Sequence, residues 1–416
     1  MAAPETTAPA SVPSGAETPA RVEPLQHGFQ AHSDGGSAYV PVQTRSERFT
    51  STSADDFAAV TGLEFEWKFA PMAKIAHLTA EPLDGSAVDV ASTPSPADGF
   101  TVDWIARDDA LIGSAGAPED RASANAWSSA EKALHIRVSG EEGGEVLVRR
   151  SGFGSAPRAA HVVIEAAVNS RGTVILEHSG DANLAENVEI VVREGAQLTV
   201  VSVQEWDDSA LHLSSHFATV GRDANLRHVI VSLGGSVVRV NPSIHLAGQG
   251  ASTDAFGLYF ADAGQFLEQR PYIDHIAADT RSRVNYKGAL QGKGAHTVWV
   301  GDVLIGPHAD GTDSYEQNRN LVLSEGTRAD SIPNLEIETG NIVGAGHASS
   351  TGRFDDEQLF YLQSRGISEE EARRLVVRGF LAEIIQQIGS PALEERLGEA
   401  VEAELLRSQG LSQGVE

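Results

Sequence analysis

The feature that most constrains the fold is a long series of short apolar runs between about Lys132 and Ile342. Runs such as EVLVRR, HVVIEAAV and QLTVVSV are four to eight residues long, rich in Val, Ile and Leu, and bounded by Gly, Asn, Asp or Ser. This pattern is typical of β-strands joined by tight turns. Helical periodicity is nearly absent from the region, so the sequence predicts a mainly β structure.

The turns between these runs resemble one another. Small or polar pairs recur at Gly195-Ala196, Asp223-Ala224, Gly250-Ala251 and Gly294-Ala295, and their alanines are 28, 27 and 44 residues apart. A strand-rich repeat of about 20–50 residues indicates a solenoid, a propeller or a stacked array, and no WD or kelch signature is present. We therefore expect a right-handed parallel β-helix, in which Val, Ile and Leu stack inward from coil to coil. The long last interval predicts an insertion or an additional turn.

The segments on either side of this core differ from it in composition. We expect a disordered, Pro- and Ala-rich tail at 1–30, a small α/β domain at 31–135, the β-helix core at 136–345 and a helical C-terminal domain at 346–416. In the α/β domain, three aromatic residues alternate with charged ones, which predicts core positions of a half-buried strand: Phe65, Trp67 and Phe69.

The C-terminal segment carries helix signals. Ser368 and Glu371 form a capping box at the start of one helix, and Ser390-Pro391 opens another after Gly389. The apolar stripe of the first helix is predicted at Ala372, Leu375, Val376, Phe380 and Ile384. The stripe of the second is predicted at Leu393, Leu397, Ala400/Val401 and Leu405.

Charge and cysteine content exclude several classes of function. The net charge of −27 arises from 58 acidic against 31 basic residues, and no basic stripe with interleaved aromatic residues argues for a nucleic-acid partner. There is no cysteine, which excludes disulfides, a thiol nucleophile and an all-cysteine metal site. No long apolar run and no basic or apolar region of a signal peptide is present, so we expect a cytoplasmic protein without a membrane segment.

A polar stretch, GTDSYEQNRNLVLSEG, lies late in the strand-rich region. One interpretation is a polar turn at the edge of the solenoid, because Asn and Asp side chains hydrogen-bond their own backbone. The other places Asp313 and Arg319 in an interface or a catalytic polar cluster. Elsewhere, His212 and His216 have a spacing that on a strand separates them by about 13 Å, too far for one metal ion. Neither histidine is assigned to a site.

Five motifs follow one another between about Val284 and Ile388, namely Y-x-x-N-R-N-L, L-E-I, a G-H pair, D-E-Q-L-F-Y-L and S-R-G-I. In this combination the segment resembles the SufB/SufD family of iron–sulfur cluster assembly proteins. The resemblance implies a β-helix core with a helical C-terminal domain, in agreement with the patterns above. It also implies a complex that builds iron–sulfur clusters and transfers them to apoproteins. In it, two paralogous β-helix subunits pair and a SufC-like, ABC-type ATPase docks on the C-terminal helices.

Many members of this family have a cysteine, one further residue and a histidine where this chain has Ala345, Gly346 and His347. The scaffold subunit SufB needs cysteine to receive sulfur, since thiolate is both the nucleophile and the soft ligand for iron. Without cysteine the chain resembles the partner subunit SufD, which implies no catalytic residue and no cofactor bound by this chain alone. The resemblance places His347 at the interface with a SufB-like subunit, as a candidate ligand for iron or a transient, shared cluster.

Two other functions stay open. Polysaccharide-active β-helix enzymes use Asp clusters with Ca²⁺, which Asp310 and Asp313 could mimic, although no aromatic strip for sugar stacking is present. A metal-free interaction solenoid would share every other feature and differ only in the role of His347. Nucleotide binding is not expected, because Gly292-Lys293 lacks the spacing of a phosphate-binding loop.

Overall fold

The computed structural model describes residues 29–30, 40–41, 48–88, 90–93, 98–353 and 356–412. The chain divides into two compact units, residues 1–44 and 45–416. In the first unit, the short strands β1 (Phe29–Gln30) and β2 (Val40–Pro41) pair antiparallel. The disordered tail predicted at 1–30 lies outside the described residues, except for Phe29 and Gln30.

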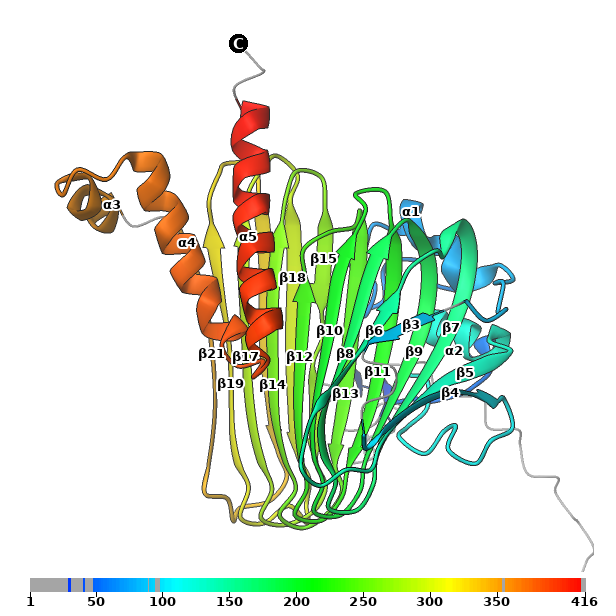
Figure 1. The fold of residues 1–416 in the computed structure, drawn as a ribbon. Helices are drawn as coiled ribbons and strands as arrows, with labels where there is room; N and C mark the ends of the chain where they lie inside the picture. The colour runs from blue at the N-terminus through cyan, green and yellow to red at the C-terminus, as the bar shows by residue number, and fades with distance from the viewer. Residues whose placement is uncertain are drawn as a thin grey trace, which may run out of the picture. The chain divides into compact units, whose positions relative to one another are not determined.

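The second unit is built around two β-sheets whose strands alternate along most of the chain (Figure 1). The nine-stranded sheet contains β3 (Val90–Thr93), β6 (Glu145–Arg150), β8 (Arg171–Gly180), β10 (Gln197–Trp206), β12 (Asn225–Ser232), β14 (Ser252–Ala261), β17 (Arg281–Leu290), β19 (Asp313–Val322) and β21 (Gly344–Arg353). The ten-stranded sheet contains β4 (Phe100–Ala106), β5 (Lys132–Val138), β7 (Gly154–Ala166), β9 (Ala182–Val192), β11 (Leu211–Val220), β13 (Val237–Leu246), β15 (Phe266–Gln269), β16 (Tyr272–His275), β18 (His296–Ile305) and β20 (Arg328–Ile337). From β5 to β21 neighbouring strands within each sheet are parallel, which confirms a mainly β protein with a parallel solenoid of about eight turns.

Alternate residues of each strand point between the two sheets and form the main core. In β8, for example, Val174 and Leu176 are fully buried there. Some aromatic rings occupy the space that a glycine leaves free in the neighbouring coil. Tyr259 is an example: its register partner is Gly288, where a Cβ would lie 1.9 Å from the Tyr259 ring. The core of the solenoid is therefore continuous from coil to coil.

One row of turns explains the repeat seen in the sequence. Gly195, Asp223, Gly250 and Asp279 all have positive φ, and the backbone N–H of each donates to a carbonyl of the corresponding turn in the next coil. Asp279 follows Gly250 by 29 residues (279 minus 250), so this row contains no insertion. Gly294 belongs to a different row of turns, as its hydrogen bond to the turn at residue 326 shows. The interval between Gly250 and Gly294 therefore contains no insertion, and the alternative predicted for it, an additional turn, is the one at Asp279.

The N-terminal part of this unit covers the outer face of the ten-stranded sheet. It contains the 3₁₀ turn η1 (Ala54–Asp56) and the helices α1 (Met72–Ala80) and α2 (Arg121–Ser129), which share an apolar cluster with outward residues of that sheet. Trp67 is buried in this cluster, with the Arg239 guanidinium 3.9 Å from its ring centre. The predicted strand around Trp67 is wrong, because its backbone forms turns closed by hydrogen bonds to Glu64.

The helices α3 (Asp356–Gln363), α4 (Glu369–Ile385) and α5 (Pro391–Ser412) follow the solenoid. Helices α4 and α5 pack on the outer face of the nine-stranded sheet (Figure 1). Ser368 caps α4 as predicted, accepting a hydrogen bond from the Glu371 N–H at 3.2 Å. The stripe predicted for α5 is buried. In α4 the predicted Ala372 and Ile384 are buried, but Leu375 is exposed, and Val377 and Leu381 are buried in addition. No helix in the described ranges is long and apolar enough to cross a membrane.

Two segments near the end of the solenoid differ from the sequence interpretation. The stretch interpreted as a polar turn is strand β19, because every second residue of it faces the core. Strand β21 continues the solenoid to Arg353, so the G-H pair that contains His347 lies on a strand of the solenoid and not among the C-terminal helices. The division of the chain at 30, 135 and 345 stays a prediction.

Candidate functional site

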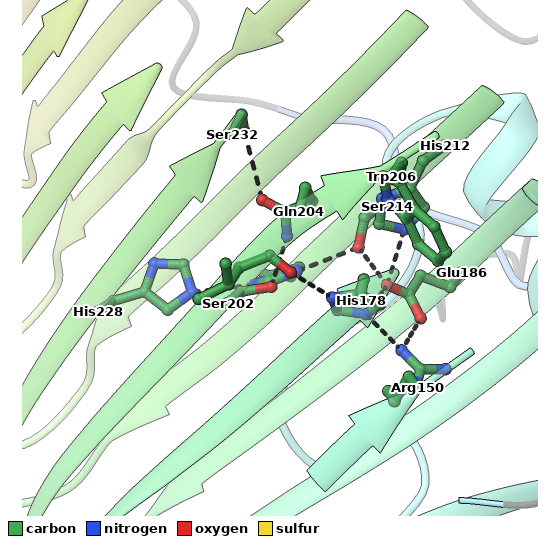
Figure 2. Close-up of polar contacts among 12 residues, drawn as sticks. Arg150, His178, Glu186, Ser202, Gln204, Trp206, His212, Ser214, His228 and Ser232 are labelled. Atoms are coloured by element: carbon green, nitrogen blue, oxygen red, sulfur yellow. Dashed lines mark hydrogen bonds and ion pairs between the residues drawn. The ribbon is translucent and has the colours of Figure 1, made fainter. Parts of the chain in front are cut away.

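Two groups of ionisable side chains inside the solenoid bring acidic and histidine residues of neighbouring strands together. The first, here called the buried network, contains residues from both sheets whose side chains meet between them (Figure 2). Its central members are Arg150 of β6, His178 of β8, Glu186 of β9 and His212 of β11. Each occupies an inward position of its strand, and polar residues follow one another there from coil to coil: His178 is the register partner of Arg150 and Gln204, and Ser214 is that of Glu186.

The carboxylate of Glu186 is the centre of the buried network. It accepts hydrogen bonds from the Arg150 guanidinium, from His212 Nε2 at 2.9 Å and from Ser214 Oγ at 3.1 Å. Burial opposes the charge on Glu186, but the cationic Arg150 and the histidine hydrogen bonds outweigh it and hold the pKa of that carboxyl well below its usual range. The network therefore holds a buried, paired carboxylate.

Hydrogen bonds also fix the protons on the two imidazoles. Trp206 Nε1 donates to His212 Nδ1 at 3.1 Å, so the proton of His212 is on Nε2, where it faces Glu186. His178 Nδ1 donates to the Val203 carbonyl at 3.0 Å, and its Nε2 accepts from Arg150 at 2.9 Å. Burial lowers the pKa of His178 to about 4, which keeps this ring neutral at pH 7.

His178, Glu186 and His212 have ligand atoms within 4.8 Å of one another, close enough for one metal ion. Whether they can bind one depends on the hydrogen bonds that these atoms already form. To bind a metal, His212 Nε2 would have to lose its proton to Nδ1, where the Trp206 N–H already points. The Arg150 guanidinium also occupies the space beside both His178 and Glu186. These residues do not fit a metal ion, and we assign the buried network to structure.

The second group lies in the last coil, where β19 and β21 are side by side. Glu316 and His347 are register partners on these strands, and the Glu316 side chain is 1% exposed whereas that of His347 is 44% exposed. Their closest atoms, Glu316 Oε1 and His347 Nδ1, are 3.8 Å apart, too far for a hydrogen bond. Neither carboxyl oxygen of Glu316 has a hydrogen-bond partner within the described residues.

The surroundings of Glu316 explain this isolation. It points toward β18, where Gly301 leaves room for it: a Cβ at Gly301 would lie 2.3 Å from Glu316 Oε2. The indole N–H of Trp299, also near Gly301, likewise lacks a partner in the part of the chain that the structure describes. Burial and the charge of Asp302 raise the pKa of Glu316 to about 9, although the backbone of Asn334 lowers it in part.

The other residues considered from the sequence lie outside this pair. Asp313 forms an ion pair with Arg283 on the outer surface, and Arg319 is exposed. His212 and His216 have different partners, since His216 Nδ1 lies 2.9 Å from His228 Nε2.

Sequence reasoning missed Glu316, His178 and Glu186. Their signal was strand parity, because each is an ionisable residue at an inward position.

Comparison with known proteins relates the chain to one family. Residues 150–380 match the SufBD core domain of SUF system FeS cluster assembly, so the likeness begins well before Val284, where the motifs placed it. An iron–sulfur cluster assembly SufBD family protein of Mycobacterium leprae is 46% identical over 387 residues, covering 88% of this chain and 95% of the relative. One of Mycobacterium tuberculosis is 47% identical over 374 residues, with 87% and 93% covered. A second such protein of Mycobacterium leprae is 28% identical over 201 residues, which are 48% of this chain and 23% of that protein.

Proposed function

We propose, because this chain belongs to the SufBD family of SUF system iron–sulfur cluster assembly proteins, that it acts as a SufD-like subunit of an assembly scaffold. Members of this family are scaffold components of cluster assembly and not classical enzymes. In this function the chain pairs with a SufB-like subunit and with a SufC-like, ABC-type ATPase. The complex is cytoplasmic, and it builds clusters and transfers them.

The observation that carries the SufD-like assignment is a family match in a chain without cysteine. A subunit that receives sulfur and holds iron through sulfur needs a thiolate. This chain has none, so the persulfide chemistry belongs to the partner. The two family proteins of Mycobacterium leprae, which differ in their likeness to this chain, support a pairing of unlike members.

The end of the solenoid supports the pairing with a second β-helix. Among the described strands, β21 pairs only with β19, and β20 only with β18. Ile337 and Val343 at this end are 44% and 76% exposed. Unpaired strand edges with exposed apolar side chains favour strand addition from another chain. A SufB-like solenoid offers strands of the same kind.

The C-terminal helices support the docking of an ATPase. Phe360 and Tyr361 of α3 are 72% and 55% exposed, an aromatic surface suited to a protein partner. Helix α4 is fixed to the sheet by the buried Lys287, which donates to the Phe380 carbonyl and pairs with Glu383. Motion of an ATPase bound to these helices would reach the solenoid through this attachment.

The end of the solenoid formed by β19, β20 and β21 is here called the open end. His347 is the proposed ligand there for iron, or for a cluster shared with the partner. Its imidazole is partly exposed on the last strand, where the partner would pair. Neutral imidazole is a suitable ligand for iron. The cluster is cargo in this proposal and not a resident cofactor.

Co-purification tests the proposal. The full chain is co-expressed with a SufB-like subunit and a SufC-like ATPase, and the product is assayed anaerobically for iron and sulfide. The expected result is a stable ternary complex that acquires a cluster, while the isolated chain stays colourless. A chain that binds neither the SufB-like subunit nor the SufC-like ATPase would overturn the proposal.

A further inference from the structure

The interior of the solenoid contains only polar side chains along one strand near its open end. Strand β19 turns Ser314, Glu316, Asn318 and Asn320 inward, whereas earlier strands of the same sheet mix aliphatic or aromatic residues with polar ones. Their register partners on β21 are Ala345, His347, Ser349 and Thr351. Strand β21, which covers this polar end, is itself partly exposed.

Most polar groups at this end are already satisfied. The Asn318 amide donates to Tyr259 Oη at 2.7 Å, and its oxygen accepts from Ser331 and from Asn320. Tyr259 in turn donates to Asn320 at 2.7 Å. Glu316 is different: within the described residues it is the one buried carboxyl group that has no hydrogen-bond partner on either oxygen.

Nor does Glu316 have a countercharge. No Lys or Arg of the described chain forms an ion pair with it, and His347 Nδ1 at 3.8 Å is its nearest ionisable partner. Glu186, equally buried, has the Arg150 guanidinium in contact. A buried carboxylate normally has a cation or a set of donors beside it. Glu316 therefore offers two buried oxygens without a hydrogen-bond partner among the described residues, and one of them lies 3.8 Å from Nδ1 of the partly exposed His347.

We propose that Glu316 is a second ligand, beside His347, for the ferrous ion that enters cluster assembly at the open end of the solenoid. The identity of the ion rests on the proposed function. A metal with bonds of about 2.1 Å to each fits between a carboxylate oxygen and an imidazole nitrogen that are 3.8 Å apart. Carboxylate and imidazole together suit divalent iron. Two protein ligands leave positions for water and for a ligand from the SufB-like subunit.

This arrangement differs from the buried network in its hydrogen bonds. In the buried network the ligand atoms of His178, Glu186 and His212 already form hydrogen bonds, so a metal would have to displace them. At the open end no hydrogen bond of normal geometry engages the oxygens of Glu316 within the described residues, and only the backbone N–H of Asn334 lies near them.

Anaerobic binding of ferrous iron to the full chain tests the inference, by equilibrium dialysis and with Co²⁺ absorption as a spectroscopic probe. The unmodified chain is expected to bind about one ion, and Glu316→Gln and His347→Gln each to weaken binding roughly tenfold or more. Glu316→Asp, which keeps a carboxylate, is expected to restore part of the affinity. The matched control is Asp274→Asn, since Asp274 faces His245 at 3.1 Å on the outer surface. This control is expected to bind like the unmodified chain.

Two results would overturn the inference: no ferrous binding by a folded chain, or unchanged binding by a Glu316→Gln variant whose circular dichroism matches that of the unmodified chain. Co-purification with the SufB-like subunit separates this failure from failure of the proposed function. Glu316→Gln is expected to form the complex normally. If iron binds but no complex forms, the cation site stands and the SufD-like function fails.

Discussion

The buried network and the open end of the solenoid contain the same residue types with opposite outcomes. Glu186 lies between coils that supply Arg150, His212 and Ser214, and its charge is fully compensated. Glu316 lies below the last coil, with His347 beyond hydrogen-bond distance and no cation in contact. Whether a His–Glu pair in a solenoid is structural or can bind a ligand therefore depends on the hydrogen bonds it makes and not on its residue types.

The difference follows from position in the stack. A residue in a middle coil is surrounded by coils on both sides, so a buried charge there folds only if its neighbours satisfy it. Glu316 also lies between two strands, β17 and β21, but β21 is the last strand of its sheet, so His347, the residue beside Glu316 on that strand, is 44% exposed. Four predictions test this contrast, ordered by the size of the expected effect.

Acid should act first on the buried network and the histidines beside it. Burial lowers the pKa of His178 and His228 to about 4, and that of His216 well below its usual range. The folded pKa is below the unfolded value of 6.5, so their stabilisation is complete above pH 6.5 and is lost as pH falls toward 4. With three protons involved, the free energy of unfolding should fall by about 4 kcal/mol per pH unit. Urea unfolding at pH 7, 6 and 5 measures this, and an unchanged midpoint would contradict it.

Arg150→Met should be the most damaging single substitution of this set. It leaves Glu186 buried without a cation, which costs about 3–5 kcal/mol of unfolding free energy. Arg149→Met is the control, because Arg149 is 53% exposed and pairs with Glu177 at the surface. Its effect should not exceed about 1 kcal/mol. Equal effects in chemical denaturation would remove the distinction between the interior and the surface.

Glu316→Gln should change the free energy of unfolding in the opposite direction and stabilise the chain. The folded pKa of Glu316, about 9, is above its ordinary value of 4.5. The contribution of the protonated Glu316 to stability is therefore complete below pH 4.5 and is lost as the pH rises to 9. The advantage of the variant should grow by about 1.4 kcal/mol per pH unit across this window, as an upper estimate. Thermal unfolding of metal-free protein at pH 5, 6.5 and 8 measures it. Glu186→Gln is the counterpart and should destabilise at each pH, so a Glu316→Gln variant that behaves in the same way would refute the contrast.

His347→Ala should have the smallest effect on stability. Its side chain is 44% exposed and makes no hydrogen bond within the described chain, so the free energy of unfolding should change by less than about 0.5 kcal/mol. His212→Ala, which removes a bond to Glu186, should cost about 1–3 kcal/mol. In the complete complex, His347→Ala should reduce cluster assembly. Unchanged assembly would leave the scaffold role and exclude His347 as a ligand.

Much of the architecture could be predicted from local patterns. Short Val- and Ile-rich runs and turns such as Gly195-Ala196 and Asp223-Ala224 specify strands of a stacked solenoid, since each needs only its own residues and its neighbours. Ser368 capped its helix as predicted for the same reason. The strand predicted at Trp67 failed because packing against Arg239 and turn hydrogen bonds outweighed a short alternating pattern.

By itself, the sequence determined the parallel solenoid, its helical end and the lack of any thiolate for sulfur chemistry. It also determined which face of a strand each residue takes, because that parity is local. Only the tertiary structure decided which ionisable residues meet. His178 and Glu186 come from opposite sheets, and their meeting depends on how the two sheets are aligned. Glu316 meets His347 because the coil between them is 31 residues long (347 minus 316), a register that no single strand encodes.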